Sequence, residues 1–234
     1  MKFYVALVLL TTLTLTTFAG DWAQWRGPNR DGVSSEKGLI DEWPEDGPKL
    51  LWKATGVGVG FSSVSIVGER IYTMGDGKDA SHVYCLSTET GKIIWTSKRV
   101  GKTGGNYKGT RCTPTVDEGH VYALGQYGDL VCLKADTGKE IWRKSLTGDF
   151  GGRSGGWNYT ESPLIDEGKV IVTPGGKKGA VVALNKKTGE PIWQSKDFTD
   201  GAQYSSLIAR EFGGERQYIQ LTGANVVGLA ANTG

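Results

Sequence analysis

The sequence predicts an all-β fold, a β-propeller built from four-stranded blades. Three observations support this prediction: a motif that repeats without gaps, a turn glycine that recurs after 47, 51 and 45 residues (Gly91, Gly138, Gly189 and Gly234), and 36 glycines among 234 residues. Glycines at this density, without the collagen period, favour tight turns between short strands over long helices. The period also matches one propeller blade, which takes about 40–50 residues.

Residues 1–20 have the features of a signal peptide. Lys2 supplies a positive charge, the stretch from Phe3 to Phe18 is uncharged and largely apolar, and Thr17 and Ala19 are small residues before the expected cleavage point. We therefore predict cleavage after Ala19 or Gly20 and export to the periplasm, the exterior or the cell envelope. An uncleaved anchor is the alternative, but the segment is short and threonine-rich for a membrane span. No later apolar stretch reaches spanning length.

An N-terminal extension, residues 21–49, is expected to precede the propeller, residues 50–234. Trp52 lies 43 residues before Trp95 and has no complete blade before it. We interpret the segment around Trp52 as an outer strand that closes a ring by completing its last blade.

Each repeat contains two hairpins and therefore four short strands. One hairpin has an apolar strand, a Thr-Gly turn and a strand whose tryptophan follows the glycine by four residues; it occupies residues 83–95, 130–142 and 181–193, and begins again at 226–234. Glycine can adopt the positive φ that such a turn needs. The residues assigned to this structural role are Gly91, Trp95, Gly138, Trp142, Gly189 and Trp193. A second glycine-containing turn upstream in each repeat supplies the other hairpin.

Other repeat architectures fit this pattern less well. Helical repeats are excluded because glycine turns interrupt every stretch long enough for an apolar helix face. An array of β-sandwiches remains open, but tryptophans at the same phase in three repeats favour identical blades.

The composition argues against a nucleic-acid-binding protein and against a disulfide framework. The 27 Lys and Arg residues are balanced by 25 Asp and Glu, for a net charge of +2, and the basic residues are scattered. Cys85 and Cys132 occupy equivalent positions in two repeats, where the third has Ala183. We expect a small, buried strand position there, which a free thiol fills well. No metal site is predicted, because His82 and His120 have no second ligand nearby in sequence.

The segment Lys134–Trp142 (KADTGKEIW) and its counterparts resemble the tryptophan-docking motif of the pyrroloquinoline quinone (PQQ) repeat family. The resemblance covers about residues 50–234 and implies a propeller, commonly eight-bladed, in which each tryptophan packs on the glycine turn of a neighbouring blade. The segment Asp21–Gly32 looks like the mature start of exported PQQ-like repeat proteins. Only about four blades are present, and an open half-ring would expose unpaired strand edges. Two copies could close one ring, but we favour a fragment of a longer chain.

The loops between blades carry the candidate binding residues, because propellers usually bind ligands on the face that these loops line. The loops at 101–111, 148–161 and 197–204 are long and mix aromatic, amide and charged groups with glycine. The candidates for ligand or partner contact are Tyr107, Arg111, Arg153, Trp157, Asn158, Tyr159, Glu161, Gln203 and Tyr204. The alternative is a set of solvated loops with an occasional stacked ring.

Glu161 and Arg111 are expected at the central channel. Glu161 precedes Ser162-Pro163, where an inner strand should begin, and Arg111 stands three residues before Pro114 in the preceding repeat. They could bind a polar ligand together, but an ion pair across the channel is the favoured hypothesis.

We interpret the chain as an exported, non-catalytic propeller that binds an envelope protein or a polysaccharide; for a polysaccharide, Trp157, Tyr159 and Tyr204 would be stacking surfaces. The resemblance implies a runner-up, a PQQ- and calcium-dependent dehydrogenase of alcohols or sugars. Such relatives hold Ca²⁺ with Glu, Asn and Asp, use an Asp base, and often carry a disulfide between adjacent cysteines. This sequence has no adjacent cysteines, and no spacing assigns Glu161 and Asn158 as calcium ligands.

Overall fold

The computed structural model describes residues 20–105 and 107–234, which form fifteen strands in four antiparallel sheets. The first sheet contains β1 (Ser65–Val67), β2 (Arg70–Asp76), β3 (Ser81–Ser87) and β4 (Ile93–Thr96). The second contains β5 (Thr115–Asp117), β6 (His120–Leu124), β7 (Asp129–Lys134) and β8 (Glu140–Ser145). The third contains β9 (Leu164–Asp166), β10 (Lys169–Val172), β11 (Val182–Asn185) and β12 (Pro191–Gln194). The fourth contains β13 (Ile208–Phe212), β14 (Glu215–Leu221) and β15 (Val226–Ala230).

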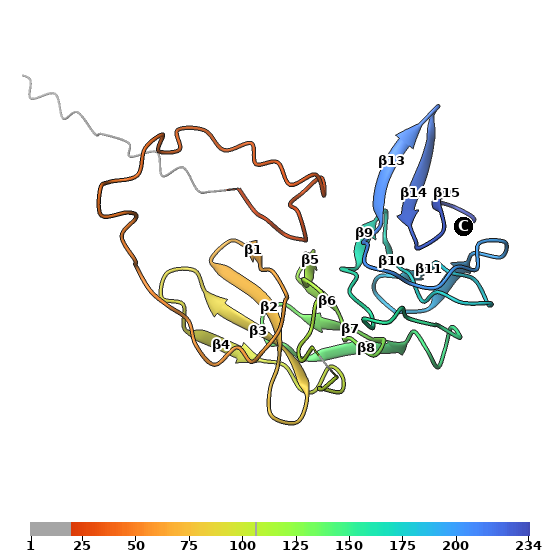
Figure 1. Ribbon diagram of the computed structural model, residues 1–234, viewed down its shortest axis with the longest axis horizontal. Coiled ribbons are helices and arrows are strands. Elements are labelled where there is room, and N and C mark those ends of the chain that lie inside the picture. The colour runs from red at the N-terminus through yellow and green to blue at the C-terminus, as the bar shows by residue number, and fades with distance from the viewer. Residues whose placement is uncertain (1–19, 106) are drawn as a thin grey trace, which may run out of the picture.

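Within each sheet the strands follow one another in chain order, and each sheet is one blade. The blades succeed one another along an arc, with β1, β5 and β9 on its inner side and β4 and β8 on its outer side (Figure 1). The first strand of the second blade, β5, contacts the first strands of both neighbouring blades, β1 and β9. The predicted all-β propeller of repeated blades is therefore confirmed, and we call the inner side of the arc the hub and the outer side the rim.

The expected signal peptide falls, apart from Gly20, outside the described residues. In the part of the chain that the structure does describe, no helix has the length and apolar character needed to cross a membrane.

At the rim, every blade receives a tryptophan from the segment before it. The indole N–H groups of Trp52, Trp95, Trp142 and Trp193 donate to the carbonyls of Thr88, Ala135, Lys186 and Ala231, at 2.9–3.1 Å. Each ring also covers the turn glycine three residues later, so closely that an added Cβ would lie 2.4–2.8 Å from it. We call this indole–glycine pair the rim contact. It joins each blade to the next with the same geometry.

The strand opposite each tryptophan carries a small residue. Cys85, Cys132 and Ala183 pair in register with Trp95, Trp142 and Trp193, and the register shifts directly after each of them. Both cysteines are buried and free, as expected from their alignment with alanine. A small side chain here leaves room for the indole to turn toward the next blade.

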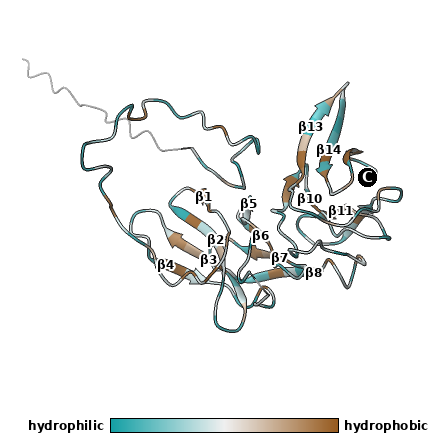
Figure 2. Ribbon diagram, viewed as in Figure 1, coloured by the Kyte–Doolittle hydropathy of each residue, from teal (hydrophilic) through white to brown (hydrophobic). Residues whose placement is uncertain are grey.

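The middle strands of each blade form the core. Hydrophobic residues concentrate on strands such as β3 and β7 (Figure 2), and the run Leu130–Leu133 of β7 is completely buried. The second blade lies between the first and the third, so β7 is covered on both faces and its sequence is continuously apolar instead of alternating.

The N-terminal extension crosses the hub. Trp22 pairs through its backbone with Ile66 of β1, and the carbonyl of Ala23 accepts a hydrogen bond from the N–H of Val116 in β5. Further along, the guanidinium of Arg30 reaches the carbonyls of Ser162 and Leu207, which precede β9 and β13. Residues 21–30 thus contact the inner edge of all four blades.

The segment around Trp52 is not part of a strand in this structure. Its indole nevertheless occupies, on Gly91 of the first blade, the position that Trp95 occupies on Gly138 of the second. The rim contact therefore forms there without the strand pairing that we expected.

Candidate functional site

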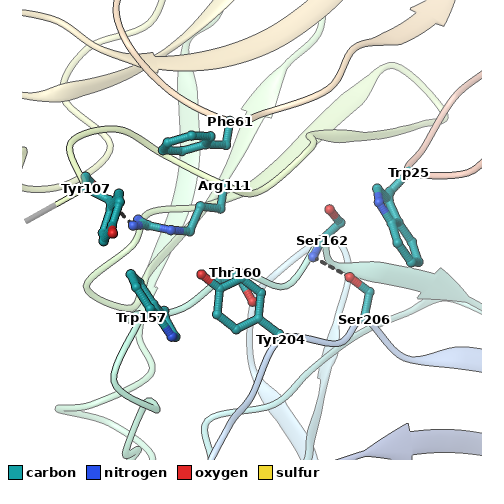
Figure 3. A pocket seen from close by; sticks show the side chains of 9 residues that line it. All are labelled: Trp25, Phe61, Tyr107, Arg111, Trp157, Thr160, Ser162, Tyr204 and Ser206. Carbon is teal, nitrogen blue, oxygen red and sulfur yellow. Dashed lines mark hydrogen bonds between the residues drawn. The ribbon is translucent and has the colours of Figure 1, made fainter.

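A pocket of about 510 Å³ opens at the hub, where the N-terminal extension meets the loops between blades (Figure 3). We call it the hub pocket. It is lined by one or more residues from each of the segments that lead into the inner strands: Trp25, Phe61, Tyr107, Arg111, Trp157, Thr160, Ser162, Tyr204 and Ser206.

Aromatic rings from three loops form one wall of the hub pocket. The ring of Trp157 lies 4.8 Å from that of Tyr107 at an interplanar angle of 54°, and 6.2 Å from that of Tyr204 at 69°. These are tilted and edge-on contacts, which aromatic pairs favour over a face-to-face stack. Because Trp157 is still 45% exposed and Tyr204 60% exposed, ring faces remain available to a ligand.

Arg111 supplies the positive charge of the hub pocket. Its guanidinium donates to the carbonyls of Gly109 and Tyr107 and to Oε1 of Gln126, each at 2.9 Å, and it lies 5.7 Å from the ring of Phe61. All of these partners are uncharged, and among the described residues no carboxylate forms an ion pair with Arg111.

The expected ion pair between Arg111 and Glu161 does not form. Glu161 is buried, and its carboxylate accepts hydrogen bonds from the backbone N–H of Thr173 at 2.7 Å and the Thr173 hydroxyl at 3.0 Å. The alternation of an extended segment explains this orientation, because Thr160 and Ser162 line the pocket and Glu161 between them points to the other side. Its guanidinium neighbour is Arg30 instead.

Arg30 lies next to the hub pocket, and the sequence did not predict this position. It is 3% exposed, and its guanidinium donates to the carbonyls of Ser162 at 3.2 Å, Leu207 at 2.8 Å and Pro163. Residues 131 positions apart are brought together here, and a lone arginine in a turn-like stretch carries no sequence signal for that role. The N-terminal extension is therefore anchored beside the pocket by a buried charge.

Burial sets the protonation of this group of residues. Desolvation raises the pKa of Glu161 to about 7, although Thr173 and Arg30 oppose the shift by stabilising the carboxylate. Desolvation also lowers the pKa of Arg30 to about 10, against the attraction of Glu161. The thiol of Cys112, which accepts a hydrogen bond from the N–H of Leu124, has its pKa raised to about 12 by burial and is inert at neutral pH.

Four of the nine candidate residues line the hub pocket: Tyr107, Arg111, Trp157 and Tyr204. Tyr159 is 2% exposed and donates its hydroxyl to the carbonyl of Pro174, so it belongs to the core and offers no stacking surface. Asn158 does not line the hub pocket itself but an adjoining depression, which shares Tyr107, Arg111 and Trp157 with it. The remaining candidates, Arg153, Glu161 and Gln203, do not line the hub pocket.

Five lining residues were not predicted: Trp25, Phe61, Thr160, Ser162 and Ser206. Phe61 and Ser206 lie in the short segments that lead into inner strands. These segments lack the length and the mixed composition by which binding loops are recognised in a sequence. Trp25 enters from the N-terminal extension, whose path across the hub has no counterpart in the repeat.

The described residues do not fit a calcium site at the hub pocket. Calcium takes six or more oxygen ligands, usually including carboxylates. No carboxylate lines the pocket, both oxygens of Glu161 are directed to Thr173, and Asn158 lines only the adjoining depression. Among the described residues, no three His, Cys, Asp or Glu side chains converge on one point.

Repeated four-stranded blades, a tryptophan on each rim glycine and a pocket at the hub define a repeat-built β-propeller with a ligand-sized cavity. The chain belongs to the PQQ-repeat family whose model is described as outer membrane protein assembly factor BamB, which matches residues 36–125 and 79–234. No curated protein matches the sequence.

Solved structures show the same fold. Quinohemoprotein alcohol dehydrogenase ADHIIG from Pseudomonas putida HK5 is 23% identical, with a TM-score of 0.57 over 76% of this chain and 26% of its own. BamB from Moraxella catarrhalis is 24% identical, with a TM-score of 0.50 over 77% of this chain and 50% of its own. Quinohemoprotein alcohol dehydrogenase from Comamonas testosteroni is 16% identical, with a TM-score of 0.52 over 92% and 48%. This chain thus spans half or less of the length of these structures.

Proposed function

We propose that this chain is a binding module of an exported protein and that the hub pocket is its binding site. The observation that carries the proposal is the lining of the pocket: five aromatic rings and one guanidinium, with no carboxylate or imidazole among the nine residues that line it. A largely apolar cavity with a few polar groups is typical of ligand binding. Acid–base catalysis instead requires a group that exchanges protons near neutral pH within reach of the substrate.

The cell envelope is the proposed location. The signal-peptide features of residues 1–20 support export, and the description of the matching family concerns the assembly of outer-membrane proteins. The proposed partner is accordingly an envelope protein or a polysaccharide, and the exposed rings of Trp157 and Tyr204 favour the polysaccharide because the C–H face of a sugar packs on an aromatic ring.

A quinoprotein dehydrogenase is the second candidate. Its support is the structural similarity to the two quinohemoprotein alcohol dehydrogenases, with TM-scores of 0.57 and 0.52. PQQ with Ca²⁺ would supply the oxidation chemistry in such an enzyme. The residues at the hub pocket do not fit the calcium ion that accompanies this cofactor, because no carboxylate lines the pocket.

The test is a panel of neutral and acidic oligosaccharides, with binding followed by tryptophan fluorescence and calorimetry. Trp157→Ala should weaken binding about tenfold, since a stacked aromatic contact contributes about 0.5–1.5 kcal/mol beyond its buried area. Trp43→Ala is the matched control, because Trp43 is an exposed tryptophan that does not line the hub pocket.

Two results would overturn the proposal that this chain is a saccharide-binding module. One is a panel on which no saccharide binds, or on which Trp157→Ala and the wild type bind alike. The other is dye-linked oxidation of alcohols or sugars after addition of PQQ and Ca²⁺, which would establish the second candidate.

A further inference from the structure

We propose that the ligand of the hub pocket is an acidic saccharide, a pyranose that carries a carboxylate which pairs with Arg111. This inference rests on the proposed function and names its ligand class. Three properties of the pocket support it: its charge, the arrangement of its rings and the position of its hydroxyl groups.

The lining of the pocket carries one positive charge, which no carboxylate of the described residues pairs with directly. Arg111 is the one charged residue among the nine that line the cavity, and its three hydrogen-bond acceptors are neutral. The carboxylate of Asp76 is linked to Arg111 only through the amide of Gln126, which donates to Asp76 at 3.3 Å, and Glu161 is directed to Thr173 beside the guanidinium of Arg30. An anion on the ligand would therefore meet a guanidinium that no carboxylate contacts directly, and such charge-assisted hydrogen bonds are the strong ones.

The rings are arranged for a ligand that stacks on one face. A flat aromatic molecule is held best between two parallel rings with a gap for its own thickness. Here Tyr107, Trp157 and Tyr204 contact one another at centroid distances of 4.8 and 6.2 Å with angles of 54° and 69°, so no parallel slot exists between them. Each ring offers a single outward face, which suits the C–H face of a pyranose.

The hydroxyl groups of Thr160 and Ser206 also line the pocket, and Ser206 lies between Tyr204 and Trp25 in Figure 3. The hydroxyl oxygen of Ser206 accepts a hydrogen bond from the backbone N–H of Ser162 at 3.0 Å, which leaves its proton available as a donor. The hydroxyl of Thr160 donates to the carbonyl of Gln203 at 3.3 Å, which leaves its oxygen available as an acceptor. A sugar, with hydroxyls around its ring, can use both. An aromatic carboxylate without hydroxyl groups has no donor for the oxygen of Thr160.

The test compares acids with their own methyl esters, which have the same shape without the charge. The probes are trimers of galacturonate, mannuronate and glucuronate and the corresponding esters, titrated calorimetrically against the full chain. At least one acid should bind about tenfold or more tightly than its ester, as expected for a charge-assisted pair. The preference should shrink as salt is raised from 0.05 to about 0.5 M, because salt screens an exposed pair.

Arg111→Gln should abolish the difference between acid and ester. Arg153→Gln is the matched control: this arginine lies on a neighbouring loop outside the hub pocket, so the preference should persist. Unchanged unfolding midpoints for both variants would show that the loops remain folded.

The outcomes separate this inference from the proposed function. Equal binding of every acid and its ester would overturn the acidic saccharide and leave a saccharide-binding pocket. The same holds if Arg111→Gln keeps the preference. Failure of all saccharides, charged or neutral, would overturn both proposals.

Discussion

At the rim, one contact is made four times: an indole covers a turn glycine and donates to a carbonyl three residues before it. At the hub, each loop contributes something different, from the phenol of Tyr107 to the guanidinium of Arg111 and the hydroxyl of Ser206. The repeated contacts join successive segments along the rim through the same indole–glycine packing and the same hydrogen bond. The hub is free to vary because its residues are not needed for that geometry, and this is where a binding site can be built.

The N-terminal extension belongs to the hub in this comparison. It supplies Trp25 to the pocket and places Arg30 beside Glu161, so a segment outside the repeats completes the irregular region. The rim, by contrast, is built from repeat residues and from Trp52, which makes the same contact with a turn glycine as the repeat tryptophans do. Three predictions break or sharpen the comparison.

The largest effect is expected at the rim. Gly138 has a φ of +69°, and a Cβ there would lie 2.5 Å from the ring of Trp95. Gly138→Ala should therefore lose about 1–2 kcal/mol through the left-handed backbone and about 1–3 kcal/mol more by displacing the indole. Urea unfolding followed by circular dichroism measures the loss.

Gly119→Ala is the control for the rim. Gly119 has a similar φ of +75°, but no atom lies within 4 Å of an added Cβ. It should show the backbone term of about 1–2 kcal/mol alone. Equal losses in the two variants would mean that the rim contact does not join the blades.

A smaller effect with a pH signature is expected at the hub. The pKa of Glu161 is about 7 in the folded protein against a model value of 4.5, so the folded state binds more protons between these values. Stability should therefore fall as pH rises from about 4.5 to 7, by about 3 kcal/mol for this group. Arg30 and Cys112, which face Glu161, have pKa values of about 10 and about 12 and both stay protonated throughout this window.

Glu161→Gln isolates this contribution. The unfolding free energy of the wild type, measured from pH 4.5 to 8 relative to that of the variant, should fall as the pH rises. A difference that stays constant across this range would show that Glu161 does not change its protonation there.

The smallest effect is expected for an exposed ion pair between blades. Lys144 of β8 lies 3.2 Å from Glu190, whose side chain is 71% exposed. Glu190→Ala should change the unfolding free energy by less than about 0.5 kcal/mol, as exposed pairs contribute little. A loss of unfolding free energy as large as that of Gly138→Ala would mean that surface ion pairs contribute as much as the indoles to the contact between blades.

Much of the fold could be predicted because it repeats. The glycine turns at 91, 138 and 189, the strands on either side and the small residues opposite Trp95, Trp142 and Trp193 all follow from local patterns that recur three times. A turn or strand pattern that occurs once is weak evidence for that structure, whereas the same pattern at the same phase in three repeats is strong evidence.

The site could be predicted only in part. Tyr107, Arg111, Trp157 and Tyr204 were predicted because aromatic and charged residues in long interblade loops are visible in the sequence without knowledge of their packing. Tyr159 and Glu161 lie in the same loop as Trp157, and nothing in the sequence distinguishes their orientation. In the structure they point into the core and form hydrogen bonds with Pro174 and Thr173, respectively. Which side of an extended segment faces the pocket depends on how the whole blade is placed.

By itself, then, the sequence determined the blades and their order, because those features depend on residues close together in the chain; the packing of each tryptophan on a neighbouring glycine turn was expected only from the family resemblance. Only the tertiary structure decided that the N-terminal extension crosses the hub, that Arg30 and not Arg111 lies beside Glu161, and that Arg111 is left facing an aromatic pocket without a carboxylate. Those choices depend on distances between segments more than a hundred residues apart, which no local pattern of residues contains.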